Sequence, residues 1–297
     1  MPSEVEFNLP DQQTEPAPVS LFRNWVAAPS LLLGVCSVLV TTTRLDLLTA
    51  GEFYDFSQCQ WPLKKFWLCE LVKDFGPLPG VIVCVLGLML LGRGFCQRHV
   101  DKHVRLGMFL VLSFLLGPGL IVNVALKNNF GRPRPHEVLE FSGRFCFAGL
   151  GIPGSAGTNS SFPSGHAAAA FFVAIAGMGL LILGRKRSGV AVTILGLVFG
   201  LGVGAARMAQ GAHFLSDILW SAGIVYLSAV IIADCTRIAE FGPAGRPLIP
   251  RRYVLNTLDR AFVTAFTWRP EHENKTQSSP IDAAAGAPIP QLARSGP

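Results

Sequence analysis

Long apolar runs alternate with short polar segments along most of the chain. Six runs are about twenty residues long and nearly free of charged side chains. They cover residues 25–43, 77–95, 104–126, 166–184, 190–206 and 214–233. A helix of about 20 apolar residues crosses roughly 30 Å of hydrocarbon. The pattern therefore predicts an all-α polytopic membrane protein with six transmembrane helices and with both termini on one side of the membrane.

Two further segments are amphipathic. In residues 61–76, Leu63, Phe66, Trp67, Leu71 and Phe75 recur at helical spacing, with charged side chains between them. Residues 252–266 repeat this pattern. Each segment suits a helix in the headgroup layer or a helix packed on the protein's own surface, and both alternatives stay open.

Polar stretches flank the predicted membrane domain. Residues 1–20 predict a disordered tail, residues 21–240 a six-span domain, and residues 241–297 a cytoplasmic tail with an amphipathic helix at 252–266. No internal repeat is visible.

Composition and charge agree with a membrane protein. Of the 297 residues, 50% are hydrophobic and only 15% charged, against roughly a quarter charged in soluble domains. The net charge of +6 comes from basic residues in the gaps between apolar runs, so it does not indicate nucleic-acid binding. With a cytoplasmic N-terminus, 16 of the 25 Lys and Arg residues lie on the cytoplasmic side, which favours cytoplasmic termini.

Seven cysteines are spread along the chain, and Cys59, Cys69 and Cys146 lie in segments assigned to the outer side. A Cys59–Cys69 disulfide is compatible with an oxidising compartment, and unbonded thiols are the alternative.

Three polar motifs lie at the ends of predicted spans. Ionisable groups are energetically costly in a membrane protein, so those that occur there are usually functional. They are Lys127 to Pro135 (KNNFGRPRP), Pro163 to His166 (PSGH), and Ala206 to Asp217 (ARMAQGAHFLSD). Lys127 ends the third span, His166 opens the fourth, Arg207 ends the fifth and His213 opens the sixth. We therefore expect all three motifs to meet at the outer face of the membrane.

These residue types suit phosphoryl transfer through a covalent intermediate. Lys127, Arg134 and Arg207 supply positive charge for phosphate oxygens, and Ser164 and Gly165 begin a helix whose amides can face an anion. His213 and Asp217 are four residues apart on one helix face, so Asp217 can accept from one ring nitrogen and leave the other free to attack phosphorus. His166 then remains to protonate the leaving oxygen.

Taken together, these motifs resemble the signature of the type-2 phosphatidic acid phosphatase superfamily over about residues 105–233. The resemblance implies a metal-independent phosphatase without a cofactor. His213 would be the phosphorylated nucleophile, His166 the acid and Asp217 the orienting partner, and Lys127, Arg134, Ser164, Gly165 and Arg207 would form the phosphate cradle. The family usually has Ser where this chain has Ala206, so one donor to the phosphate is missing.

The remaining side chains near the motifs carry weaker expectations. We expect Arg132 to contact the loop rather than a phosphate, and His136 to be solvated. His99 and His103 have a metal-like spacing but no third ligand, so we predict no metal site. Residues 137–162 are expected to cap the pocket and to help choose the headgroup.

A site at the membrane edge suits an amphiphilic phosphate. The partners expected are therefore a lipid phosphate and the membrane, and the location is a bacterial inner membrane with the site on its periplasmic face. The segment after the first span, with Asp46, Glu52 and Asp55, resembles the corresponding region of lipid A phosphatases, which ranks lipid A phosphate first. Undecaprenyl pyrophosphate, phosphatidate and phosphatidylglycerophosphate remain alternatives, as do a lipid phosphotransferase and a non-enzymatic scaffold or transporter.

Overall fold

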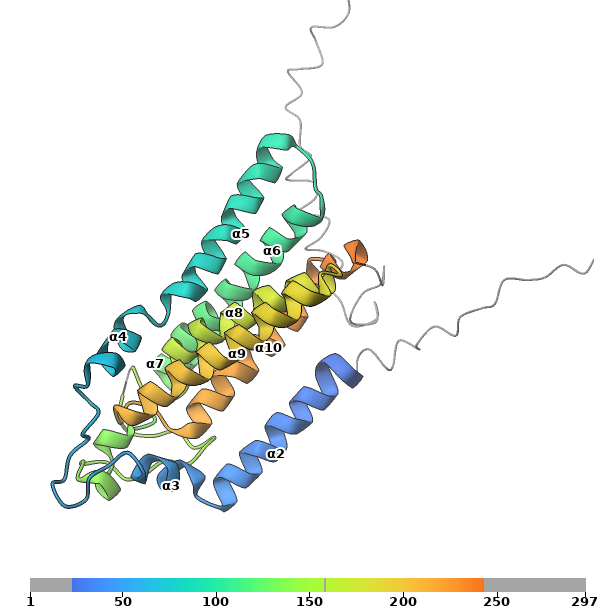
Figure 1. The fold of residues 1–297 in the computed structure, drawn as a ribbon. Helices are drawn as coiled ribbons and strands as arrows, with labels where there is room; N and C mark the ends of the chain where they lie inside the picture. Colours follow the sequence, from blue (N-terminus) through green and yellow to red (C-terminus); the bar gives the residue numbers. More distant parts are fainter. Residues whose placement is uncertain (1–22, 158, 243–297) are drawn as a thin grey trace, which may run out of the picture.

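The computed structural model describes residues 23–157 and 159–242, which form a bundle of helices (Figure 1). The longer helices are α2 (Ala28–Thr42), α4 (Trp67–Phe75), α5 (Leu78–Gln97), α6 (Lys102–Phe114), η2 (Leu115–Leu126), α8 (Gly165–Ile182), α9 (Lys186–Ala209) and α10 (Leu215–Cys235). The short ones are η1 (Arg23–Ala27), α3 (Leu45–Gly51), α7 (Lys127–Asn129), η3 (Pro135–Glu137), η4 (Leu139–Phe141) and η5 (Ile238–Phe241). These two ranges contain no β-strand.

Six candidate spans are long and apolar enough to cross a membrane, which confirms the predicted all-α polytopic fold. They are Trp25–Thr42, Trp67–Gln97, Lys102–Asn129, Gly165–Ile182, Lys186–Ala209 and Leu215–Cys235. Five of them match the predicted spans closely. The second begins earlier than expected, because α4 is followed almost directly by α5 across Gly76 and Pro77.

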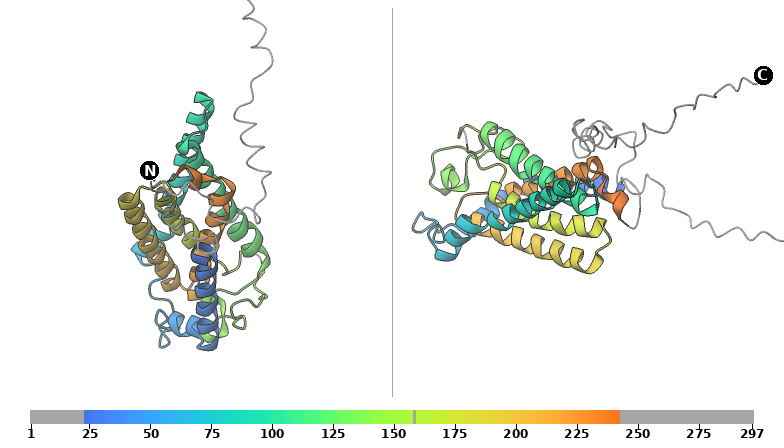
Figure 2. Two further views of the ribbon diagram at one scale, coloured as in Figure 1. Left: turned by 90° about the vertical axis from the view of Figure 1, so that its right-hand side faces the viewer. Right: turned by 90° about the horizontal axis from the view of Figure 1, so that it is seen from above.

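The six spans lie side by side, with α8 at the centre and α2 at the edge beside α10 (Figures 1 and 2). In the span of α8, 72% of the residues are buried, against 6% in the first span. Glycines let the neighbours approach α8 closely. A Cβ on Gly80 of α5 would lie 2.0 Å from the carbonyl oxygen of Ala169, and one on Gly196 of α9 would lie 2.2 Å from the amide nitrogen of Ala174. Such small-residue contacts are typical of helix packing in membranes.

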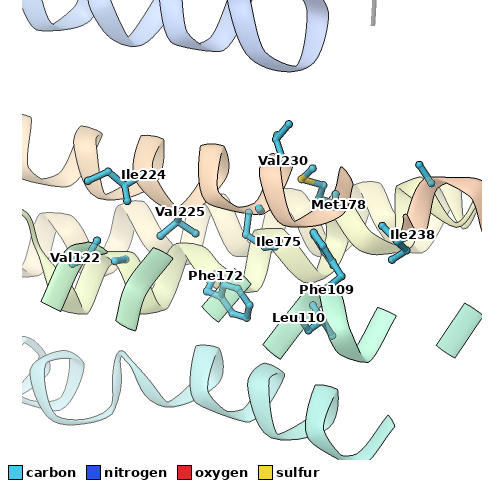
Figure 3. Packing of buried hydrophobic residues seen from close by; sticks show 14 residues of the cluster. Phe109, Leu110, Val122, Phe172, Ile175, Met178, Ile224, Val225, Val230 and Ile238 are labelled. Carbon is cyan, nitrogen blue, oxygen red and sulfur yellow. The ribbon is translucent and has the colours of Figure 1, made fainter. Parts of the chain in front are cut away.

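The core between α6, α8 and α10 is apolar along most of its length (Figure 3). Phe109 and Phe172 are fully buried there, together with Val122, Val225 and Val230. The outer faces of the bundle instead expose large apolar side chains such as those of α2, α5 and α9. Exposed apolar side chains on spanning helices suit contact with lipid tails.

An aromatic cluster closes one end of the bundle. Tyr54, Trp61 and Phe141 pack with ring centroids 5.2–5.3 Å apart, and Phe214 is buried in the same cluster. The cluster joins the segment after the first span to the short helix η4 and to the residue that precedes α10. The segment after the first span is distant from the three motifs in sequence, and the cluster holds it against the end of the bundle where the motifs lie.

Several predictions concern the segments outside the core. The tail at 1–20 and the amphipathic helix at 252–266 lie outside the described residues. The amphipathic segment 61–76 forms α4, which turns Cys69 and Val72 toward a groove beside α9 and leaves Trp67 and Phe75 exposed. Cys59 and Cys69 are both free thiols, so the disulfide that their spacing allows is not present.

Candidate active site

The three motifs meet at one end of the bundle. Lys127 forms the start of α7, His166 lies in the first turn of α8, Arg207 lies in the last turn of α9, and His213 precedes α10. The charges of Lys127, Arg134 and Arg207 all act on His166, and those of Lys127 and Arg207 also act on His213. The structure thus gathers the predicted cations and both histidines around one point.

Hydrogen bonds to α10 fix the start of α8. Ser164 caps the helix, and its Oγ accepts from the amide of Ala167 at 3.4 Å. The amide of Ser164 donates to Oγ of Ser221 at 2.9 Å, and Ser221 donates to the carbonyl of Asp217 at 2.6 Å. Because Ser164 is fully buried and caps its own helix, its expected contact with a phosphate stays a prediction.

A cavity of about 280 Å³ opens beside His166 and Lys127. Its other lining residues come from α5, from the end of the third span and from α8: Pro77, Val81, Phe114, Pro118, Gly119, Asn123, Gly165 and Ala169. The wall is therefore mostly apolar, with a cation and an imidazole at its polar end. Gly165 lies close to this wall, because a Cβ at this position would lie 2.4 Å from Oδ1 of Asn123 and the Asn123 side chain would have to move.

His213 is held by a backbone carbonyl. Its Nδ1 lies 2.7 Å from the carbonyl oxygen of Ser161 but 3.6 Å from Oδ2 of Asp217, which is too long for a hydrogen bond. The expected direct hydrogen bond from His213 to Asp217 is therefore corrected. Asp217 instead accepts from Oγ of Ser161 at 2.5 Å and from the amide of Phe214 at 2.8 Å.

This arrangement leaves Nε2 of His213 with the free electron pair, because the carbonyl of Ser161 can only accept a proton from Nδ1. The side chain is 1% exposed. Burial lowers the pKa of His213 to about 4, against the opposing effect of the Asp217 carboxylate. At neutral pH the ring is therefore neutral and able to act as a nucleophile.

Arg132 lies at the centre of the buried polar network. Its Nε donates to the loop carbonyl of Ala148 at 2.9 Å, which agrees with the expected loop contact. Its Nη1 also donates to Asp217 at 2.5 Å and to Ser216 at 2.8 Å, and its Nη2 donates to Asp46 at 2.8 Å. Although burial disfavours its charge, the carboxylates of Asp217 and Asp46 raise the pKa of Arg132.

The two other arginines are oriented differently. Nη1 of Arg207 donates to Oε1 of Gln210 at 2.5 Å, and Nε2 of Gln210 donates to Glu70 of α4 at 2.9 Å. Nε of Arg207 is buried without a hydrogen-bond partner among the described residues, so it can serve an anion. Arg134 is less buried, and its Nη2 donates to the carbonyl of Asn159 at 3.0 Å. Ala206 lines the apolar groove between α4 and α9.

His136 is not simply solvated, as the sequence had suggested. Its Nδ1 lies 2.7 Å from the carbonyl oxygen of Gly211, and its amide donates to the same oxygen at 3.0 Å. Burial lowers the pKa of His136. The residue therefore clamps the turn that leads into His213.

Sequence reasoning missed Ser161 and Asp46 as parts of this network and underestimated Arg132. Ser161 lies two positions before Pro163, the first residue of PSGH. Asp46 lies far away in the sequence, after the first span. A usable signal was the position of Arg132 two residues before Arg134 in GRPRP, which places a second arginine beside the predicted site. Nothing in the sequence pointed from Asp46 to Arg132.

Comparison with known proteins identifies similar chains. The model of the PAP2 superfamily matches residues 106–239. A lipid A 4′-phosphatase of Francisella tularensis subsp. novicida is 32% identical over 191 residues, which are 64% of this chain and 85% of that protein. A lipid A 4′-phosphatase of Rhizobium leguminosarum is 36% identical over 182 residues (58% and 74%), and a lipid A 1-phosphatase of Rhizobium johnstonii is 28% identical over 255 residues (79% and 96%). No solved structure shows significant similarity.

Proposed function

This chain belongs to the PAP2 superfamily and is a membrane-bound lipid phosphatase, and we propose from this premise that it removes a phosphate monoester from lipid A through a phosphohistidine at His213. The observation that carries the mechanism is the bond from Nδ1 of His213 to the carbonyl of Ser161. It leaves Nε2 free in a buried position near the charges of Lys127 and Arg207. A nucleophilic imidazole in such a place suits attack on phosphorus.

The first step forms an N–P bond and breaks the P–O bond to the lipid. Nε2 of His213 attacks the phosphorus, and His166 gives its proton to the lipid oxygen that leaves. Lys127, Arg134 and Arg207, with the amide of Gly165, hold the phosphate oxygens, whose negative charge they offset. Asp217 lies 3.6 Å from Nδ1 and stabilises the positive charge that the ring gains.

The second step returns the enzyme to its starting state. Water attacks the phosphorus, the N–P bond breaks, and the water proton passes to His166. Inorganic phosphate then leaves the cradle. No metal is needed, because the three cations and the helix start can carry the charge of the phosphoryl group.

Lipid A is favoured as the substrate for two reasons. Two relatives above 30% identity described here are lipid A 4′-phosphatases, so we propose that the 4′-phosphate is removed. The apolar wall of the cavity beside Lys127 and His166 also suits a phosphate attached to an amphiphile.

The charge distribution supports a periplasmic site in the bacterial inner membrane. The loops at the end of the bundle away from His213 carry Arg98, Lys102, Arg185, Lys186 and Arg187. An excess of Lys and Arg marks the cytoplasmic side. We therefore place both termini in the cytoplasm and His213 at the periplasmic face.

The test is phosphate release by the purified protein in detergent with EDTA. Lipid A, undecaprenyl pyrophosphate and phosphatidate serve as substrates, and mass spectrometry locates the phosphate lost from lipid A. We expect loss of the 4′-phosphate by the wild type and none by His213→Ala. Release from another lipid alone would overturn the substrate, and transfer of labelled phosphate to an acceptor lipid instead of water would overturn hydrolysis.

A further inference from the structure

A continuous buried network links the segment after the first span to His213. Asp46 of α3 accepts from Arg132 at 2.8 Å, and Arg132 donates to Asp217 at 2.5 Å. Asp217 accepts from Oγ of Ser161, whose carbonyl accepts from His213. Asp46 lies outside residues 106–239, which carry the family match.

The three charged members of this network are shielded from water and from substrate. The exposed fractions are 2% for Asp46, 0% for Arg132 and 0% for Asp217. Burying ions is costly unless their hydrogen-bonding groups are satisfied. Arg132 meets this demand with all three of its nitrogens, since Nε, Nη1 and Nη2 each donate to an oxygen. A guanidinium so fully engaged has one orientation.

Asp46 determines that orientation from the other side. Its Oδ1 accepts from the amide of Ser216 at 2.8 Å, and its Oδ2 accepts from Oγ of Ser216 at 2.6 Å as well as from Arg132. Ser216 belongs to the first turn of α10 and is adjacent to Asp217. Asp46 therefore fixes both the arginine and the helix turn that carries Asp217.

We propose that Asp46 and Arg132 are positioning residues for the nucleophile: Asp46 aligns Arg132, and Arg132 aligns Asp217 and thereby Ser161 and the ring of His213. This inference rests on the proposed attack by His213. Neither residue touches the substrate. Their effect is to keep Nε2 aimed at phosphorus and to keep Asp217 ionised behind the ring.

The kinetic test uses Arg132→Lys, which keeps the charge but loses the fork of donors, and Asp46→Asn, which keeps the shape but loses the charge. We expect kcat to fall roughly 100-fold in each, the scale of a misplacement of about 1 Å, with KM within about twofold of the wild type. The matched controls are Arg187→Lys, exposed in the first turn of α9, and Glu240→Gln in η5, both at the end of the bundle away from His213. Both controls should keep kcat.

A double variant tests whether Asp46 acts through Arg132. If it does, adding Asp46→Asn to Arg132→Lys lowers kcat by much less than the product of the two single effects. Multiplying effects would overturn this order of action. Unchanged kcat in both single variants would overturn the whole proposal.

Measuring the folded fraction of each variant separates an effect on positioning from an effect on folding. Variants are compared by the kcat of their folded fraction, and Ser216→Ala, which removes one hydroxyl and no charge, provides a milder perturbation with an expected smaller loss of kcat. A loss of activity that only follows the loss of folded protein would overturn the proposal.

Nitrogen NMR of the protein labelled in its six histidines reports directly on His213, whose signal is assigned with His213→Ala. Lys127, Arg207, His166 and Asp217 are the charged or titratable groups that face this ring. We expect the Nδ1–H tautomer in the wild type. In Arg132→Lys we expect a mixture of tautomers, because the Ser161 carbonyl is no longer held in place. An unchanged tautomer would overturn the proposal, even in a protein that hydrolyses no tested lipid.

Different outcomes contradict the proposed function and the positioning role of Asp46 and Arg132. Failure of the wild type to release phosphate, or activity that survives in His213→Ala, contradicts the proposed function. Phosphate release that requires His213 but tolerates Arg132→Lys and Asp46→Asn contradicts the positioning role alone.

Discussion

Replacing Ser161 by alanine separates the two ways in which Asp217 could support His213. The substitution keeps the backbone carbonyl that holds Nδ1 of His213 at 2.7 Å and removes the hydroxyl that donates to Asp217 at 2.5 Å. If Asp217 contacted the ring directly, losing this hydroxyl would matter little. In the observed geometry it removes the link between the carboxylate and the segment that orients the ring.

The expected magnitude follows from the partners that remain. Asp217 keeps the amide of Phe214 at 2.8 Å and the guanidinium of Arg132 at 2.5 Å, so its charge is not left unpaired. A hydrogen bond to a charged group contributes about 1.5–3 kcal/mol, and we expect the lower end of this range. The free energy of unfolding should therefore fall by about 1.5 kcal/mol and kcat by roughly tenfold, with little change in KM.

The assay combines chemical unfolding in detergent with phosphate release from the preferred lipid. Ser113→Ala is the matched control, because Ser113 is also buried but its Oγ has no hydrogen-bond partner among the described residues. This control should keep its activity and lose no stability. Wild-type kcat in Ser161→Ala, with the protein folded, would refute the indirect role of Asp217.

Three further predictions concern the same site. With a pKa of about 4 for His213, phosphate release should persist at pH 5, and a midpoint of the acid limb above pH 6 would contradict the buried neutral ring. Because the unfolded chain binds that proton more readily, the free energy of unfolding should also fall as the pH drops from about 6.5 towards 4. Gly165→Ala should lower kcat/KM at least roughly tenfold, since its Cβ would lie 2.4 Å from Oδ1 of Asn123, and Asn123→Ala should restore part of the activity if this clash is the cause. Gln210→Ala removes the side chain that holds Nη1 of Arg207. Arg207 should then lose its contact with the phosphate, and KM should rise about tenfold, the effect of one charge-assisted hydrogen bond. An unchanged KM in a lipid titration would argue against a phosphate contact by Arg207.

The amphipathic segment shows how a sequence pattern can be read correctly and still leave its role open. Helical spacing predicted a helix in residues 61–76, and α4 (Trp67–Phe75) lies there. The pattern could not reveal that Glu70 reaches Gln210 and so supports Arg207. That contact depends on how α4 packs beside α9, which local periodicity does not contain.

The sequence by itself determined the membrane class, the six spans and the order of the three motifs. The hydrocarbon layer accounts for the membrane class and the spans, because every crossing needs a long apolar helix with its backbone hydrogen bonds satisfied internally. Alternating spans then bring Lys127, His166, Arg207 and His213 to one end of the bundle whatever the packing.

Only the tertiary structure decided which side chains meet within that end. Asp46 and Arg132 are 86 positions apart, and their contact depends on where α3 is held by the aromatic cluster and α10. The hydrogen bond from His213 to Ser161, rather than to Asp217 four residues later, likewise depends on a loop from another span. Buried ions choose partners by three-dimensional access to unpaired donors and acceptors, and this access is set by packing rather than by spacing along the chain.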